Sequence, residues 1–184
     1  PVEILGKRGF LVESASEEET RLISFEGNLI NAKNDLNQIV IAKDFKGYYD
    51  PALITIENDH YLLISNQEHL LVCNSKKINS KNINRRNDDE YLFNSENCKE
   101  YELGDKRFER NAGSIFKFNS KIYRFTMNNQ KTYGESVDLV EIQEINPKNL
   151  TQKVIKKNFL KNEFKKLGYD FSKYHHISLI GDIN

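Results

Sequence analysis

Apolar and polar residues alternate along much of this chain with a period of two, which is typical of β-strands with one buried face. Residues 54–56 and 61–65 are two such runs, and the four polar residues between them suit a tight turn. The pattern therefore predicts a β-hairpin at this place. The same arrangement predicts two more hairpins, one from residues 2–5 and 10–13 and one from residues 115–118 and 121–125.

A four-stranded unit occurs three times, because a further apolar run and then a looser segment follow each predicted hairpin. Phe10, Tyr61 and Tyr123 hold equivalent positions in the three units, at spacings of 51 and 62 residues. Units that recur about every 40–50 residues are typical of β-propeller blades. The predicted blades are residues about 1–45, 46–108 and 109–170, with the start of another at 171–184.

Three blades and a fragment are too few to close a propeller, whose rings usually hold about 4–8 blades. A blade cannot bury both of its faces alone, so it needs neighbours. We therefore predict an all-β chain in which residues 1–184 are an incomplete piece of a larger propeller. A single antiparallel β domain with long loops is the alternative, since short alternating strands fit both architectures.

The composition mainly excludes classes of partner and location. Lys and Arg number 27 and Asp and Glu number 27, so the neutral chain has no overall attraction to nucleic acid or an anionic membrane. We find neither an apolar run of about 18 residues, as a membrane span requires, nor a signal-peptide pattern. Cys73 and Cys98 are too few for a disulfide framework. We expect both to be unpaired, in a reducing, cytoplasmic compartment.

The segment 148–166 departs from the β pattern, since it holds seven Lys and one Glu. Its apolar residues predict a short helix at 161–167. Such a segment is either a basic patch for phosphate or another polyanion, or a solvated connection in a Lys-rich protein. We favour the solvated connection.

Motifs for cofactors and metals are missing from the sequence. There is no Gly-rich phosphate loop and no Cys-x-x-Cys, and no pair of His has metal-ligand spacing on a helix. His175 and His176 are adjacent, so on a strand they would point to opposite faces. We expect no cofactor and no metal ion.

The candidate binding residues lie at the starts of predicted strands, whose ends line the central pocket of a propeller. Asp50 precedes Pro51 and is either an acid, base or hydroxyl ligand, or the first residue of a structural turn. Arg110 opens the next blade and either reaches a ligand or pairs with a neighbouring surface carboxylate. Arg124 lies in an apolar and aromatic strand, so we expect it to be half-buried and to need a carboxylate or a ligand.

The segment from Arg110 to Ile142 carries the most specific pattern: R-N-A-G-S-I-F, then K-I-Y-R, Y-G and E-I. It resembles the domain at the N-terminus of plant glucosamine inositolphosphorylceramide transferases. Bacterial relatives of that domain accompany polysaccharide-biosynthesis enzymes, sometimes fused to formyltransferase-like domains. The resemblance implies a five-bladed propeller like that of arabinanases, β-xylosidases and invertases. Weaker similarities to other blades occur at residues 10–14, at Asp50 with 61–63, and at His176 with 181–182.

Glycosidases of this architecture use acidic residues at the mouth of the channel, so the resemblance implies Asp50 and Glu13 as catalytic carboxylates. Two departures argue against hydrolysis. Met127 and Asn128 stand where the family tends to have Gln-Asp, and an earlier blade that carries an Asp has no counterpart here.

We therefore expect a carbohydrate-active or carbohydrate-binding domain, accessory to glycosyl transfer in bacterial cell-surface polysaccharide biosynthesis. Its partners would be a sugar or nucleotide-sugar and a fused or separate glycosyltransferase or formyltransferase domain, with no nucleic acid and no membrane span. A glycoside hydrolase and a non-catalytic interaction propeller are the alternatives. The expected ligand-binding residues are Arg110 and Arg124 for hydroxyls or an anionic sugar, Tyr133 as a stacking platform and His176 as a donor.

Overall fold

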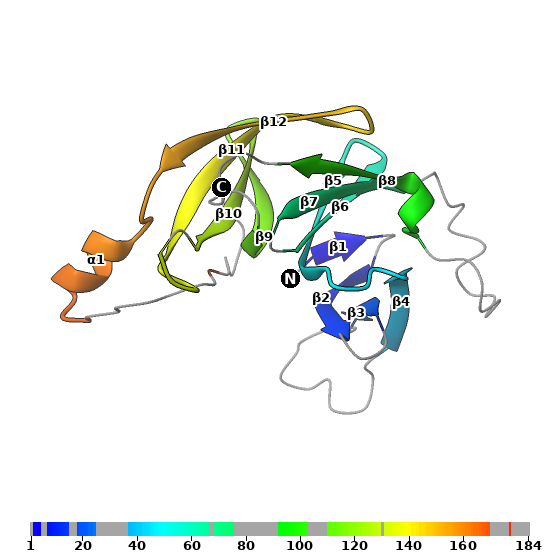
Figure 1. Cartoon of the computed structure of the whole chain (residues 1–184), viewed down its shortest axis with the longest axis horizontal. Coiled ribbons are helices and arrows are strands. Elements are labelled where there is room, and N and C mark those ends of the chain that lie inside the picture. The colour runs from blue at the N-terminus through cyan, green and yellow to red at the C-terminus, as the bar shows by residue number, and fades with distance from the viewer. Residues whose placement is uncertain are drawn as a thin grey trace.

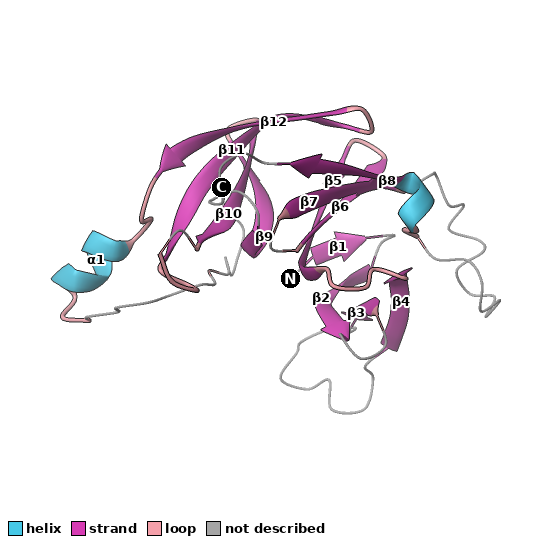
Figure 2. Ribbon diagram, viewed as in Figure 1, coloured by secondary structure: helices cyan, strands magenta, loops and turns pink. Residues whose placement is uncertain are grey.

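The structure is a computed structural model that describes residues 2–4, 7–14, 18–24, 37–66, 68–75, 92–102, 110–129, 131–169 and 177. These residues form three antiparallel sheets in which the strands follow chain order (Figure 1, Figure 2). The first sheet holds β1 (Val2–Ile4), β2 (Lys7–Ser14), β3 (Glu19–Ser24) and β4 (Asn37–Lys43). The second holds β5 (Tyr49–Ile56), β6 (Asp59–Ser65), β7 (His69–Asn74) and β8 (Cys98–Glu102). The third holds β9 (Arg110–Phe118), β10 (Lys121–Asn128), β11 (Ser136–Asn146) and β12 (Asn149–Lys156).

The predicted all-β fold with three successive four-stranded units is confirmed. A 3-10 turn, η2 (Ser95–Asn97), and one short helix, α1 (Lys161–Lys166), complete the described elements. The helix α1 lies where the Lys-rich segment predicts one, but residues 149–156 of that segment form β12, so the predicted departure from the β pattern is wrong for its first half. The first strands of the units, β1, β5 and β9, lie next to one another, which is consistent with part of a propeller. The total of five blades stays a prediction. None of the described helices is long and apolar enough to cross a membrane.

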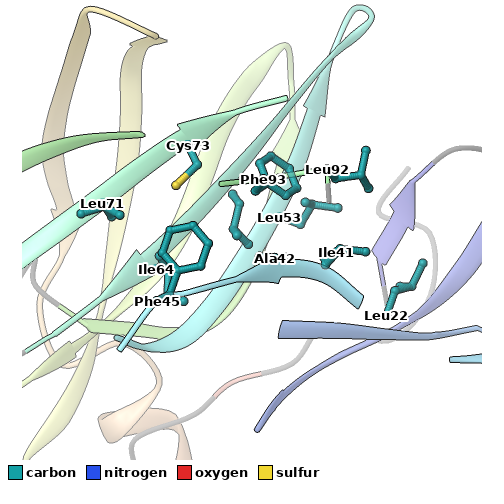
Figure 3. Packing of buried hydrophobic residues seen from close by; sticks show 11 residues of the cluster. Leu22, Ile41, Ala42, Phe45, Leu53, Ile64, Leu71, Cys73, Leu92 and Phe93 are labelled. Carbon is teal, nitrogen blue, oxygen red and sulfur yellow. The ribbon is translucent and has the colours of Figure 1, made fainter. Parts of the chain in front are cut away.

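The sheets pack face to face on apolar side chains. Figure 3 shows the layer between the first and second sheets, where side chains of β3 and β4 meet those of β5, β6 and β7. A second layer joins the second and third sheets. Each sheet therefore buries a face only by packing on its neighbour, as expected of stacked blades. The second layer comprises Ala52, Ile54, Tyr61, Leu63, Leu70, Val72, Ile115, Ile142 and Leu150.

The hairpin between β9 and β10 shows how local sequence sets the turns. Asn119 and Ser120 both have left-handed backbone, with φ of 47° and 62°. Two successive left-handed residues fit the right-handed twist of the flanking strands, and Asn tolerates this conformation better than most residues. The turn pairs Phe118 with Lys121 directly, as the sequence predicts.

Gly113 in β9 allows a close approach of the backbone at Ile177. Its φ is +136°, and Ile177 lies beside it in a parallel bridge. The Ile177 N–H donates to the carbonyl of Ala112 at 2.7 Å. A Cβ on residue 113 would lie 1.8 Å from the Ile177 carbonyl oxygen, so only glycine fits. The remaining residues of the predicted segment 171–184 lie outside the described part of the chain.

Gly113→Ala is expected to lower the free energy of unfolding by at least about 2 kcal/mol, because the added methyl group must displace backbone. Urea denaturation measures this change. Gly168→Ala is the matched control, since Gly168 also has positive φ (+81°) but a Cβ added there would have no atom within 4 Å. The control should lose only about 1 kcal/mol. Equal losses in the two variants would show that Ile177 does not pack on β9.

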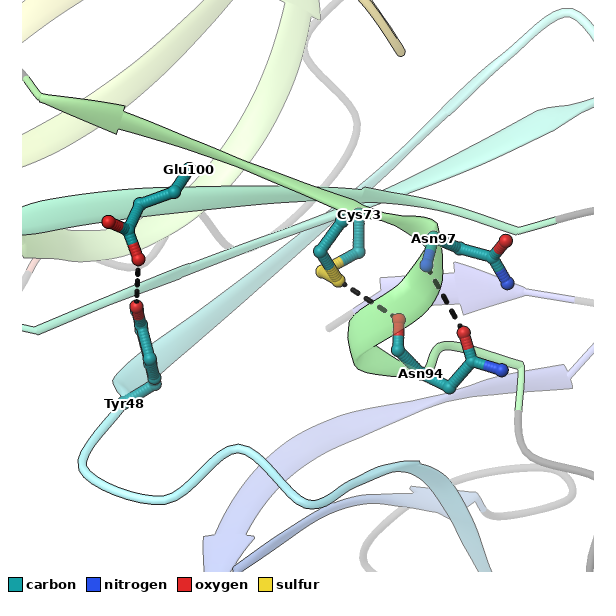
Figure 4. Close-up of a disulfide and its surroundings, with 6 residues drawn as sticks. Tyr48, Cys73, Asn94, Asn97 and Glu100 are labelled. Carbon is teal, nitrogen blue, oxygen red and sulfur yellow. Dashed lines mark hydrogen bonds between the residues drawn. A yellow bond between two sulfur atoms is a disulfide. The ribbon is translucent and has the colours of Figure 1, made fainter.

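The prediction that the two cysteines are unpaired is wrong, because Cys73 and Cys98 form a disulfide (Figure 4). The strand β8 pairs with β7 so that Cys73 faces Cys98 directly. The sequence pattern predicts a looser fourth segment in this unit but does not place it at β8, and without that pairing nothing brings the two residues together. The expectation of a reducing compartment is based on unpaired cysteines, so it loses that basis, because disulfides persist mainly in oxidising compartments.

Candidate functional site

Asp50 lies at an irregular point of β5, where the pairing with β6 shifts between Tyr49 and Ala52. Its φ is 55°, a left-handed conformation that is uncommon for non-glycine residues and opposed by the proline that follows. Two hydrogen bonds hold the backbone of Asp50 in this conformation. The Asp50 N–H donates to Oε2 of Glu13 at 2.6 Å, and the Asp50 carbonyl accepts from Nδ2 of Asn111 at 2.7 Å. Backbone strain of about 1–3 kcal/mol that persists in this way is often found at functional sites.

The Asp50 carboxylate binds Arg110, the first residue of β9. Nε of Arg110 donates to Oδ2 of Asp50 at 2.5 Å, and the two side chains are 15% and 27% exposed. The guanidinium also lies over two aromatic rings, 5.6 Å from the centre of Tyr49 and 5.3 Å from that of Tyr133. Burial lowers the pKa of Arg110, but the hydrogen bond to Asp50 and its negative charge raise it by more. The pKa of Arg110 is therefore higher than its usual value. Arg110 is therefore a fixed cation between two tyrosines.

Glu13, near the end of β2, brings a second carboxylate to this place. Desolvation is the main cause that raises the pKa of the Glu13 carboxyl above its usual value. The bond from the Asp50 N–H lowers this pKa, the negative charge of Asp50 raises it, and Arg110 lowers it. Glu13 therefore takes up a proton more readily than an isolated glutamate. We name Glu13, Tyr49, Asp50, Arg110 and Tyr133 the Asp50 cluster.

A small pocket adjoins the Asp50 cluster, and Glu13 and Tyr49 belong to both the pocket and the cluster. Tyr48 in its wall donates to Oε2 of Glu100 at 2.7 Å. Burial and then Glu100 raise the pKa of Tyr48 to about 12, so its hydroxyl stays protonated. The other lining residues are Glu18, Glu19, Thr20, Phe45, Gly47 and Ile64.

Arg124 in β10 lies behind the Asp50 cluster and is fully buried. Its Nη1 donates to Oδ1 of Asn111 at 2.6 Å, and its Nε donates to Oε1 of Gln152 at 2.7 Å. Burial lowers the pKa of Arg124 to about 9. Asn111 in turn donates to the carbonyls of Asp50 and Leu63. A continuous chain of hydrogen bonds therefore joins Arg124 to the strained backbone of Asp50.

The structure thus brings Asp50, Arg110 and Arg124 to one region, with Asn111 as the link. The Asp50 carboxylate pairs with Arg110 of the third sheet. Tyr133 is 57% exposed in the connection between β10 and β11. His176 lies outside the described residues.

Sequence reasoning missed Tyr49 and Asn111. Tyr49 immediately precedes Asp50, and Asn111 immediately follows Arg110, so both were next to residues already singled out. No side-chain group that could hold a metal ion, counted as three or more His, Cys, Asp or Glu, occurs in the described part of the chain.

The stacked sheets and the Asp50 cluster define an all-β domain, consistent with part of a propeller, that carries a polar site flanked by tyrosines. A family model described as "Glucosamine inositolphosphorylceramide transferase 1, N-terminal" matches residues 7–181. The chain belongs to this family. No curated protein and no solved structure matches the chain.

Proposed function

We propose that this domain binds a sugar or nucleotide-sugar at the Asp50 cluster and serves as an accessory to glycosyl transfer in the synthesis of cell-surface polysaccharide. The observation that carries the proposal is the Asp50–Arg110 ion pair held between Tyr49 and Tyr133. The family's name supports a context of glycosyl transfer. A glycosyltransferase or formyltransferase domain, fused or separate, would perform the chemistry.

The chemistry of the cluster suits a sugar. The C–H groups on one face of a pyranose carry partial positive charge, and the face of an aromatic ring is negative, so the exposed ring of Tyr133 offers a stacking platform. Carboxylate oxygens of Asp50 and Glu13 accept from hydroxyls, and the remaining N–H groups of Arg110 donate to them. Arg124 is fully buried, so we assign it the support of Asp50 through Asn111 instead of contact with the ligand.

Glycoside hydrolysis is a second candidate function. The observation in its favour is the raised pKa of Glu13 beside Asp50, because a pair of carboxylates with different proton affinities can divide the roles of acid and base. In that case Glu13 would donate a proton to the leaving oxygen, and Asp50 would act as nucleophile or base. Glu13→Gln would then abolish hydrolysis of oligosaccharides, whose sugar leaving groups need the proton, while sugar binding would persist.

Tyr133→Ala tests the proposed function. Binding to a panel of monosaccharides, oligosaccharides and nucleotide-sugars is measured by calorimetry, and we expect the variant to bind at least about tenfold more weakly, or about 1.4 kcal/mol. Tyr169→Ala is the matched control, because Tyr169 is 58% exposed but is not part of the cluster. Equal affinity of the two variants, or no binding to any sugar of the panel, would contradict the proposal. The remaining alternative would then be a non-catalytic interaction propeller.

A further inference from the structure

Residues 156–169, which we name the basic segment, concentrate positive charge on a chain that is neutral overall. The segment includes α1 and its flanks, and its one acidic residue is Glu163. All of its lysines are exposed, so their charges face solvent. They are Lys156, Lys157, Lys161, Lys165 and Lys166.

The basic segment is held to the third sheet at its start and then leaves the sheet. The Asn158 N–H donates to Oδ1 of Asp138 at 2.8 Å, and the Phe159 N–H donates to the carbonyl of Val137 at 2.7 Å. The Phe159 ring packs on Phe125 at 5.5 Å between centres. Beyond these anchors, α1 projects past the edge of the sheet (Figure 1). The lysines are therefore presented away from the body of the domain.

Large apolar side chains are exposed among these lysines. Leu167 is 70% exposed and Tyr169 is 58% exposed, and both closely follow Lys165 and Lys166. Leu167 has the largest exposed fraction of the big apolar residues in the described part of the chain. A solvated connection or a nucleic-acid surface would leave Leu167 in water. A surface with anionic groups outside and hydrocarbon beneath would bury it while binding the lysines.

We propose that the basic segment docks this domain on an anionic phospholipid surface. Lys161, Lys165 and Lys166 bind headgroup phosphates, while Leu167 and Tyr169 enter the boundary between headgroups and acyl chains. Docking of this kind is peripheral and needs no spanning helix. The proposal is independent of sugar binding, because none of these residues belongs to the Asp50 cluster.

Vesicle sedimentation with the full chain tests the proposal. The vesicles are phosphatidylcholine alone or phosphatidylcholine mixed with phosphatidylserine, and we expect binding only to the second kind. Lys165→Glu/Lys166→Glu should weaken that binding at least about tenfold. Leu167→Ser should weaken it several-fold, and high salt should weaken it further by screening the lysines. Far-UV circular dichroism checks that each variant is folded.

Lys46→Glu/Lys117→Glu is the control, because it makes the same change of net charge at exposed lysines outside the segment and should leave binding unchanged. Equal loss of binding in the two double variants would contradict docking by the basic segment. Failure to bind phosphatidylserine vesicles would overturn the proposal. So would unchanged binding of Leu167→Ser together with full displacement by double-stranded DNA, which would identify a general polyanion site.

Discussion

Arg124→Met is expected to lower the free energy of unfolding by roughly 3–5 kcal/mol. Methionine has a similar length but no donor, so Oδ1 of Asn111 and Oε1 of Gln152 would each lose the hydrogen bond from the guanidinium inside the protein. An unsatisfied buried polar group costs about 1–3 kcal/mol, and the imperfect fit of methionine adds to this. Urea denaturation followed by circular dichroism measures the loss.

Arg110→Met is the matched control for that change. Arg110 is partly exposed, and its partner Asp50 can be rehydrated, so we expect a stability loss of only about 1 kcal/mol but loss of sugar binding. The two variants thus distinguish an arginine that stabilises the fold, Arg124, from an arginine that contacts the ligand, Arg110. A stable Arg124→Met protein with unchanged unfolding would contradict the assigned role of Arg124.

Cys73→Ser/Cys98→Ser is expected to lower the free energy of unfolding by about 3–4 kcal/mol, because the disulfide restricts a loop of 25 residues in the unfolded chain. Cys73 is also fully buried in the layer between the first and second sheets, so a hydroxyl there adds to the cost. The measurement is the urea midpoint with and without dithiothreitol.

Dithiothreitol should shift the midpoint of the native protein and leave that of the double variant unchanged. Mass spectrometry of alkylated, unfolded protein without reductant should show no modified cysteine. Two alkylated cysteines and a midpoint insensitive to dithiothreitol would restore the prediction of free thiols.

Strands with clear alternation could be predicted from the sequence, and the mostly polar strand β8 could not. The hairpin of β9 and β10 follows from its apolar runs and the Asn119–Ser120 turn. The strand β8 reads CKEYE, which is mostly polar, and only its pairing with β7 makes it a strand. Its omission caused the error on the cysteines, because the pairing of Cys73 and Cys98 depends on that register.

The charged residues of the candidate site could be predicted from the sequence, but their geometry could not. Asp50 and Arg110 stand out because polar residues open apolar strands. The left-handed backbone of Asp50 arises where the β5–β6 register shifts, and the bonds to Glu13 and Asn111 that hold it come from other sheets. Such contacts between sheets depend on tertiary packing, which no local pattern encodes. The burial of Arg124 exceeds the predicted half-burial for the same reason, since β12 supplies Gln152.

The most direct test of sugar binding at the Asp50 cluster is a titration of the ¹⁵N-labelled chain with the best-bound sugar of the panel, followed by amide chemical shifts. We expect the largest shifts at Tyr49, Asp50, Arg110 and Tyr133, because their backbone or side chains form the cluster. The amides of the basic segment should not move. Saturable shifts confined to other parts of the chain, or no shifts with any sugar, would contradict the account.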